Sequence, residues 1–161
     1  MAYPNGFTYI SGPVKYVLST LSSTCTVKAR NPVTLSDDRS VIEAASDSTA
    51  IYGISAHDAA NSIYPGKILV EIPTPETIYA TKVQTGAATS ETSVGQSHGI
   101  EKSGDYFQLN VDSTQTNMLC IVPRDNFATV DSADSSVFVH WNGNFLGVFS
   151  SNASVDIFDE N

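Results

Sequence analysis

The feature that most constrains the fold of this chain is a series of short runs in which apolar and polar residues alternate. The clearest runs are 25–30, 68–72 and 106–111, and residues 14–18 begin an earlier one. A period of two places successive side chains on opposite faces of a β-strand. Turn-forming clusters such as Ser103-Gly104-Asp105 separate the runs. Short strands with this spacing predict an all-β fold, either a small β-barrel or a sandwich.

The length of 161 residues suits one ordinary domain with short appendages. We expect an N-terminal arm over residues 1–12, a β-barrel or sandwich domain over 13–122, and an acidic C-terminal β-hairpin extension or subdomain over 123–161. The longest apolar run, residues 118–122, is far shorter than the roughly 20 residues that span a bilayer. The first twelve residues carry no Lys or Arg and no long apolar segment, so we expect no secretory signal.

The charge of the chain argues against several classes of partner. The formal net charge is −9, and residues 125–161 contain six acidic residues and no Lys or Arg. An acidic surface repels the phosphate backbone of nucleic acids and also anionic membranes. We therefore expect neither nucleic acid nor membrane as a partner. The acidic end has two interpretations: it keeps the protein soluble, or it docks onto a basic surface.

A β-hairpin is predicted near the C-terminus, where Asn142-Gly143 separates the apolar runs 137–141 and 144–149. An Asn-Gly pair adopts the positive φ angles that a two-residue hairpin turn requires. In the predicted register Val139 lies opposite Leu146. Both faces of such a hairpin are apolar, and these are the residues concerned: Val137, Val139, Trp141, Leu146 and Val148 on one face, and Phe138, His140, Phe145 and Phe149 on the other. Another part of this chain or another subunit must therefore cover the second face.

The N-terminal segment has a similar character. Its first ten residues include Tyr3, Phe7 and Tyr9 and no charged side chain, and Pro4 makes a helix improbable there. An uncharged aromatic segment requires a surface on which to lie. It either adds a strand to the sheet of its own chain or reaches a neighbouring molecule by strand addition.

No catalytic or metal-binding motif stands out in the sequence. The three histidines, His57, His98 and His140, do not have metal-ligand spacing to one another or to a cysteine. No nucleophile elbow, phosphate-binding glycine loop or zinc-protease motif is present. Cys25 and Cys120 lie in apolar runs and are expected to be buried thiols. We therefore predict that the protein is not an enzyme and uses no cofactor or metal.

One part of the sequence resembles a known family. Residues 47–55 read Asp-Ser-Thr-Ala-Ile-Tyr-Gly-Ile-Ser, and they follow two strand-like segments, 33–35 and 41–45. The run over 65–72 then looks like a strand that closes a barrel. This order resembles the head decoration (cement) proteins of tailed bacteriophages, which have a β-tulip or SH3-like barrel. The resemblance covers residues 11–122 and does not extend to the acidic end.

The resemblance implies a structural virion protein that binds the outside of a phage capsid and stabilises the mature head without catalysis. Its partner would be the major capsid protein, and it would act as a homotrimer assembled in the host cytoplasm. Removing the first ten residues is then expected to abolish binding to heads and to leave the fold intact. The candidate contacts with the capsid or a neighbouring subunit are Tyr3, Pro4, Phe7, Tyr9, Phe138, His140, Phe145 and Phe149.

An alternative is a receptor- or carbohydrate-binding module of a phage head or tail fibre. Its support is the Ser/Thr-rich, acidic loops together with Trp141, Tyr106 and Tyr64, whose rings could stack on sugars. A hydrolase would require a pair of acidic residues, and no pair is singled out by its spacing.

Overall fold

A computed structural model describes residues 5–46, 50–83, 97–110, 119–121 and 136–141. This part of the chain is all-β, as the alternation predicts. It contains eleven strands, β1 to β11, and a short 3-10 turn, η1 (Ala59–Asn61). None of its helical segments is long and apolar enough to span a membrane.

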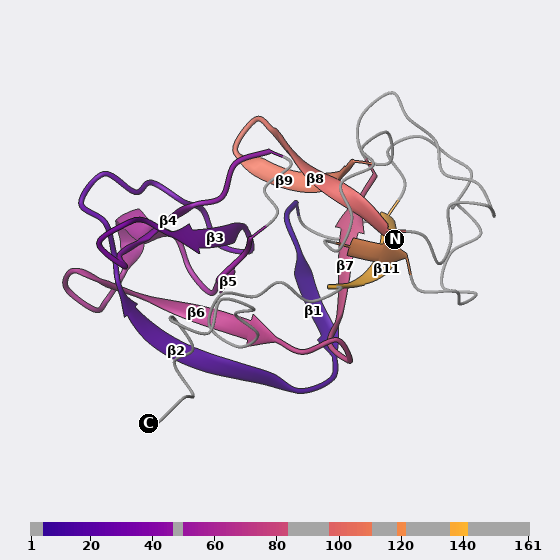
Figure 1. The fold of residues 1–161 in the computed structure, drawn as a ribbon, viewed down its shortest axis with the longest axis horizontal. Helices are drawn as coiled ribbons and strands as arrows, with labels where there is room; N and C mark the ends of the chain where they lie inside the picture. Colours follow the sequence, from indigo (N-terminus) through magenta and orange to yellow (C-terminus); the bar gives the residue numbers. More distant parts are fainter. Residues whose placement is uncertain (1–4, 47–49, 84–96, 111–118, 122–135, 142–161) are drawn as a thin grey trace.

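The strands form two antiparallel sheets, which lie at opposite ends of the view in Figure 1. The first sheet has six strands in this order: β1 (Thr8–Ser11), β7 (Ile78–Lys82), β11 (Ser136–Trp141), β10 (Leu119–Ile121), β8 (Ser97–Ser103) and β9 (Tyr106–Asn110). The second sheet has five: β2 (Val14–Thr20), β6 (Lys67–Pro73), β5 (Gly53–Ser55), β3 (Pro32–Leu35) and β4 (Val41–Glu43). Within the described ranges no strand ladder closes either sheet into a barrel. A single bridge between Leu21 and Val41 links the end of β2 to β4, and a single bridge between Val83 and Leu109 links the end of β7 to β9.

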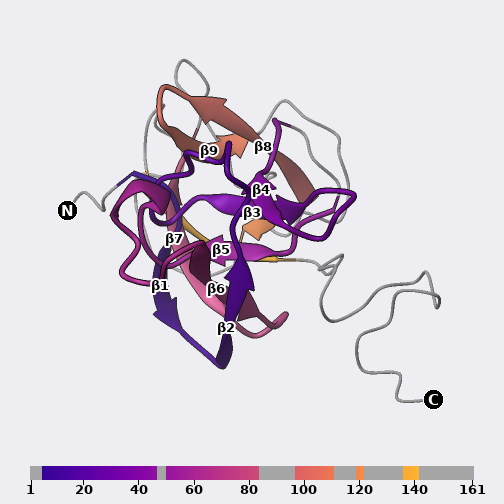
Figure 2. The ribbon, with the colours of Figure 1, turned by 90° about the vertical axis from the view of Figure 1, so that its left-hand side faces the viewer.

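The two sheets are joined by a bent two-stranded ribbon. The segment β1–β2 pairs along its length with the segment β6–β7, and both segments turn from one sheet into the other at the same corner. Figure 2 shows β1 and β2 meeting at this corner. Gly12 has a φ of 98°, and a Cβ there would lie 2.4 Å from the carbonyl oxygen of Glu76. The buried Thr77 hydroxyl donates to the carbonyl of Pro13, so the two turns are tied together.

Each sheet has its own apolar cluster, and the two clusters meet at β5. Ile68, Val70 and Ile72 of β6 point into the cluster of the five-stranded sheet, as their alternation predicts. Ile54 of β5 points the other way and is buried in the cluster of the six-stranded sheet. In that cluster Phe107 is also fully buried. The central face of the smaller sheet is thus covered by the larger one.

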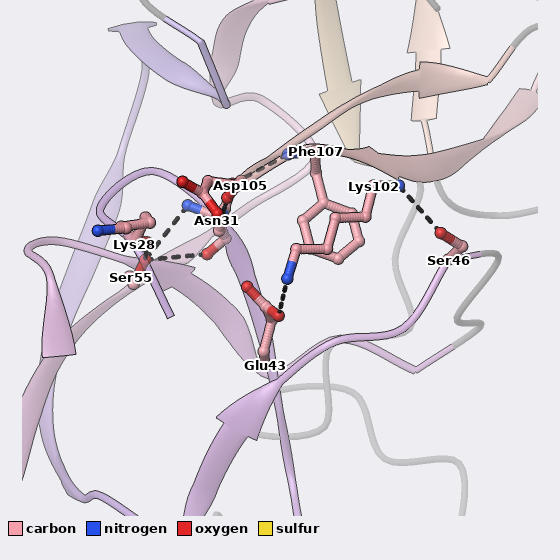
Figure 3. A network of polar contacts seen from close by, with 8 residues as sticks. All are labelled: Lys28, Asn31, Glu43, Ser46, Ser55, Lys102, Asp105 and Phe107. Atoms are coloured by element: carbon pink, nitrogen blue, oxygen red, sulfur yellow. Dashed lines mark hydrogen bonds and ion pairs between the residues drawn. The ribbon is translucent and has the colours of Figure 1, made fainter. Parts of the chain in front are cut away.

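A buried asparagine fastens the β8–β9 hairpin to the smaller sheet (Figure 3). The Asn31 side-chain amide donates to the carbonyl of Asp105 at 2.7 Å, and the Asn31 Oδ1 accepts from the backbone N–H of Phe107 at 3.1 Å. Nearby, Lys102 forms an ion pair with Glu43 at 2.6 Å. These contacts bridge residues that are more than 55 positions apart in the sequence.

One predicted strand is absent. Residues 25–30 alternate in sequence, but they form an irregular segment that ends in a turn. Only Val27 of its three apolar residues is fully buried, and it packs in the cluster of the five-stranded sheet. Cys25 in the same segment is a free, half-buried thiol. Alternation over six residues therefore did not distinguish a strand from a loop with one anchoring side chain.

The described part of the N-terminal arm belongs to its own molecule. β1 is the edge strand of the six-stranded sheet and pairs with β7. Phe7 is 1% exposed and packs on Trp141 with ring centroids 5.1 Å apart. The backbone N–H of Phe7 donates to the carbonyl of Arg30 at 2.8 Å. Of the two interpretations of this segment, the addition of a strand to its own sheet holds for β1. The prediction of Phe7 as a contact with the capsid or another subunit is wrong, because its own chain buries it.

The predicted register of the C-terminal hairpin is also wrong. Val139 has strand partners on both sides, Tyr79 of β7 and Ile121 of β10, so no edge is left for pairing with Leu146. β11 lies inside the six-stranded sheet rather than in an extension after residue 122. A strand that is apolar on both faces is typical of such a central position. The turn at 142–143 and the run 144–149 lie outside the described residues.

Candidate interaction surface

The outward face of the β2–β6 pair carries the largest cluster of exposed apolar side chains among the described residues. Tyr16 is 53% exposed and Leu18 is 44% exposed. They lie directly across from Glu71 and Leu69 of β6, so the four side chains share one face. Val17 points the other way and packs against the core of the five-stranded sheet. β2 therefore has an apolar side chain on each of its faces.

The position of β2 explains why this face is uncovered. Ile54 of β5 pairs with Glu71 and shares its face, and Ile54 is buried beneath the six-stranded sheet. β2 lies on the far side of β6, at the edge of the sheet order. The larger sheet thus covers the β5 side of this face and leaves the β2 side in solvent. Contiguous exposed apolar residues of this kind are typical of interaction surfaces.

A row of four side chains crosses from one sheet to the other at the ribbon corner, and we call it the tyrosine row: Tyr9, Tyr79, Glu71 and Tyr16. Tyr9 meets Tyr79 edge to face, with ring centroids 6.2 Å apart. The Tyr79 hydroxyl donates to Oε1 of Glu71 at 3.1 Å, and Tyr16 lies across the ladder from Glu71. The Tyr9 hydroxyl donates to the carbonyl of Gly12 at 2.5 Å, which fixes its ring at the corner.

The carboxylate of Glu71 dominates the electrostatics of this row. Burial raises the pKa of Glu71 above its ordinary value, although the Tyr79 hydrogen bond acts in the opposite direction. The negative charge of Glu71 is the largest cause of the raised pKa of Tyr16. Burial raises the pKa of Tyr79 strongly, and the nearby Glu71 adds to the effect. The row therefore holds one partly desolvated negative charge among three phenol rings.

Replacing Glu71 by glutamine is expected to stabilise the fold at neutral pH. The folded state raises the pKa of Glu71, so it binds a proton more tightly than the unfolded state, and the stability falls as the pH rises through that pKa. Glu71→Gln removes this penalty and keeps an acceptor for the Tyr79 hydroxyl. We expect a gain of roughly 0.5 kcal/mol at pH 7, because solvent still screens a half-buried carboxylate.

Urea unfolding at several pH values checks this prediction. The difference between Glu71→Gln and the wild type should disappear below the ordinary Glu pKa of 4.5, where both side chains are neutral. A variant that is less stable than the wild type at pH 7 would contradict the account of Glu71 as a desolvated charge.

The residues predicted from sequence as contacts differ in how exposed the structure leaves them. Tyr9 is 40% exposed and belongs to the tyrosine row. Phe138 and His140 are half-buried on one face of β11, as their alternation with Val137, Val139 and Trp141 predicts. Phe7 is in the core. The remaining candidates lie outside the described residues: Tyr3, Pro4, Phe145 and Phe149.

Sequence reasoning missed Tyr16, Leu18 and Glu71 as members of a surface. A signal was present in the sequence. Val14, Tyr16 and Leu18 form one apolar face of the strand, and Val17 adds an apolar residue to the opposite, otherwise polar face. When a strand has apolar side chains on both faces, only one face can pack in the core of its own sheet, so the other face must be covered by a different element or lie exposed. Which face remains uncovered depends on the placement of the second sheet, and no local pattern encodes that.

The side chains proposed for stacking on sugars are poorly placed for that role. Trp141 is fully buried. Tyr106 lies beneath the Arg30 guanidinium, with the Arg30 Cζ 5.7 Å from the ring centroid. Tyr64 is half-buried, and its ring lies 6.1 Å from that of His57.

The described residues also form a small polar cavity. Its volume is about 180 Å³, below the roughly 300–1,000 Å³ of typical small-molecule sites. The cavity is lined by Asn5, Gly6, Lys82, Ser103, Tyr106, Phe107 and Gln108. No group of three or more His, Cys, Asp or Glu side chains with metal-binding geometry occurs in the part of the chain that the structure describes.

Comparison with protein-family models and with curated proteins finds no match for this chain.

Proposed function

We propose that this protein is a structural virion protein that binds the outside of a phage capsid and stabilises the mature head, with no catalytic role. The observation that carries the proposal is the uncovered apolar face of β2, an edge strand on which Tyr16 and Leu18 are exposed. The resemblance of residues 11–122 to head decoration proteins implies that the partner is the major capsid protein. The two lines of support are independent of each other.

The proposal differs from the sequence-based expectation in the surface that makes the contact. The N-terminal segment is occupied in its own sheet from Thr8 to Ser11, so the docking face moves to β2 and β6. A single contact through a few exposed side chains gives modest affinity. Many copies on one head, grouped as homotrimers, would act together through multivalency. Size-exclusion chromatography with light scattering reports whether the free protein is a trimer.

Co-sedimentation with expanded heads and with procapsids tests the proposal. We expect the wild type to bind expanded heads selectively. Leu18→Lys should weaken that binding by about tenfold to a hundredfold, because it places a charge in the centre of an apolar contact. Ile63→Ser is the control: Ile63 is 80% exposed but lies in the connection before β6, outside the two strands that form this face, so its variant should bind normally.

Three results would contradict the proposal. The first is a wild-type protein that binds neither expanded heads nor procapsids. The second is a Leu18→Lys variant that binds heads like the wild type. A change of oligomeric state in Leu18→Lys would also count against capsid docking, since it would assign this face to contacts between copies of the chain.

A further inference from the structure

The docking face contains a negative charge without a cationic partner. The Glu71 carboxylate accepts one hydrogen bond from a described residue, the Tyr79 hydroxyl. The ion pair that the described ranges contain, Lys102 with Glu43, lies elsewhere. On the face of Glu71 the nearest lysine along the strand is Lys67, four positions away, or about 13 Å at the rise of a β-strand. Glu71 therefore has an open acceptor oxygen and an uncompensated charge.

The surroundings of Glu71 suit a cation better than a neutral ligand. The faces of phenol rings attract cations, and Tyr16 and Tyr9 are the exposed rings of the row. A saccharide would require several converging hydrogen-bond donors and acceptors. Here the Tyr79 hydroxyl already donates its hydrogen bond to Glu71, and the Tyr9 hydroxyl donates to the carbonyl of Gly12. What the row offers a ligand is one charged acceptor beside aromatic surface.

Charge complementarity also holds beyond the row. The whole chain has a formal net charge of −9, so its field attracts basic partners. Glu76 lies in the turn that packs against Gly12, which adds an acidic residue at the same corner. The titratable groups that face Glu71 are the phenols of Tyr9, Tyr16 and Tyr79, and these are neutral at physiological pH. The row therefore presents net negative charge to a docking partner.

We propose that the tyrosine row is a binding site for a cationic side chain, a lysine ammonium or an arginine guanidinium, of the protein on which the β2 face docks. The cation would lie against the Tyr16 ring and pair with the free oxygen of Glu71. Leu18 and Leu69 would form the apolar part of the contact beside it. The inference rests on the proposed function only in placing both contacts on one face, since the chemistry of the row is independent of the capsid.

The site is tested on the full, isolated chain by NMR titration with short probe peptides. The probes are acetylated and amidated Gly-Lys-Gly and Gly-Arg-Gly, with the norleucine peptide as a neutral match and maltotriose as a saccharide. We expect the cationic peptides to shift the backbone amides of Tyr16, Glu71 and Tyr79, with dissociation constants of about 1–10 mM. Added salt should weaken this binding, because the charge is partly exposed.

Matched variants separate charge from shape. Glu71→Gln should reduce the affinity for the cationic peptides about tenfold while the fold becomes slightly more stable, so a folding defect cannot explain the loss. Tyr16→Phe keeps the ring and should bind normally, whereas Tyr16→Ser should lose a similar factor. The inference is overturned if the norleucine peptide binds as well as the lysine peptide, or if maltotriose binds and Glu71→Gln leaves that binding unchanged.

Head binding distinguishes this inference from the proposed function. If both hold, Glu71→Gln and Leu18→Lys each weaken co-sedimentation. If Leu18→Lys fails to bind heads while Glu71→Gln binds normally, the cation site is overturned and the docking face stands. If the isolated chain binds the cationic peptides but Leu18→Lys binds heads normally, the cation site stands and capsid docking through this face is overturned.

Discussion

Replacing Phe7 by alanine is expected to lower the free energy of unfolding by about 3–5 kcal/mol. Phe7 is 1% exposed and packs against the buried Trp141 ring, so the substitution removes a large apolar surface and leaves a cavity between them. Urea unfolding monitored by the fluorescence of Trp141, the single tryptophan in the chain, reports directly on this contact. Ile63→Ala is the control, because an exposed side chain should change the stability by less than about 0.5 kcal/mol.

The same argument reverses the expected result of removing residues 1–10. The sequence suggested that the fold would survive this truncation. In the structure, the deleted segment contains Phe7 and most of β1, which pairs with β7. We therefore expect the truncated protein to be severely destabilised. Phe7→Leu, which keeps most of the volume, should lie between the wild type and the alanine variant. A truncated protein with wild-type stability would contradict the placement of this segment in the core.

Sequence reasoning succeeded where a strand's neighbours are close in the sequence. β3 and β4 are joined by a short turn. β9 follows β8 across the turn at Gly104. The sequence had indicated strand-like segments over 33–35 and 41–45, a strand over 106–111 and a turn at Ser103-Gly104-Asp105, because local patterns determine such features. It had not indicated β8. The all-β class follows from the same signals.

The errors concern strands whose partners lie far away. β1 pairs with β7 about 70 residues later, and β11 lies between β7 and β10. Alternation reports which faces of a strand are apolar, but it does not reveal which molecule or which strand covers them. Alternation alone therefore left open whether the aromatic arm and the two-faced strand over residues 137–141 are covered by their own chain or by another molecule. In the structure Phe7 is buried within its own chain, and Phe138 is half-buried on β11. The site at Tyr16 and Glu71 was missed for the corresponding reason, since its exposure results from where the second sheet ends.

The second large effect is expected at Asn31. The Asn31→Leu variant should lose about 2–4 kcal/mol of stability, because the leucine cannot bond the two backbone groups that the buried amide serves. The N–H of Phe107 and the C=O of Asp105 would lose their partner at the interface of the β8–β9 hairpin with the smaller sheet. The apolar side chain fits the volume, so the cost arises from unpaired polar groups rather than from a cavity.

Two measurements and one control make the Asn31 prediction specific. Urea unfolding gives the loss of stability, and hydrogen exchange should show that the Phe107 amide loses protection in Asn31→Leu. Asn31→Asp keeps the acceptor for Phe107 but removes the donor to Asp105 and buries a charge, so it should also be destabilised, and more at neutral than at acidic pH. Asn61→Ala removes an exposed amide and should be nearly neutral. Wild-type stability in Asn31→Leu together with a protected Phe107 amide would contradict this prediction. The β8–β9 hairpin would then be held mainly by the Lys102–Glu43 ion pair and by its apolar contacts rather than by the Asn31 hydrogen bonds.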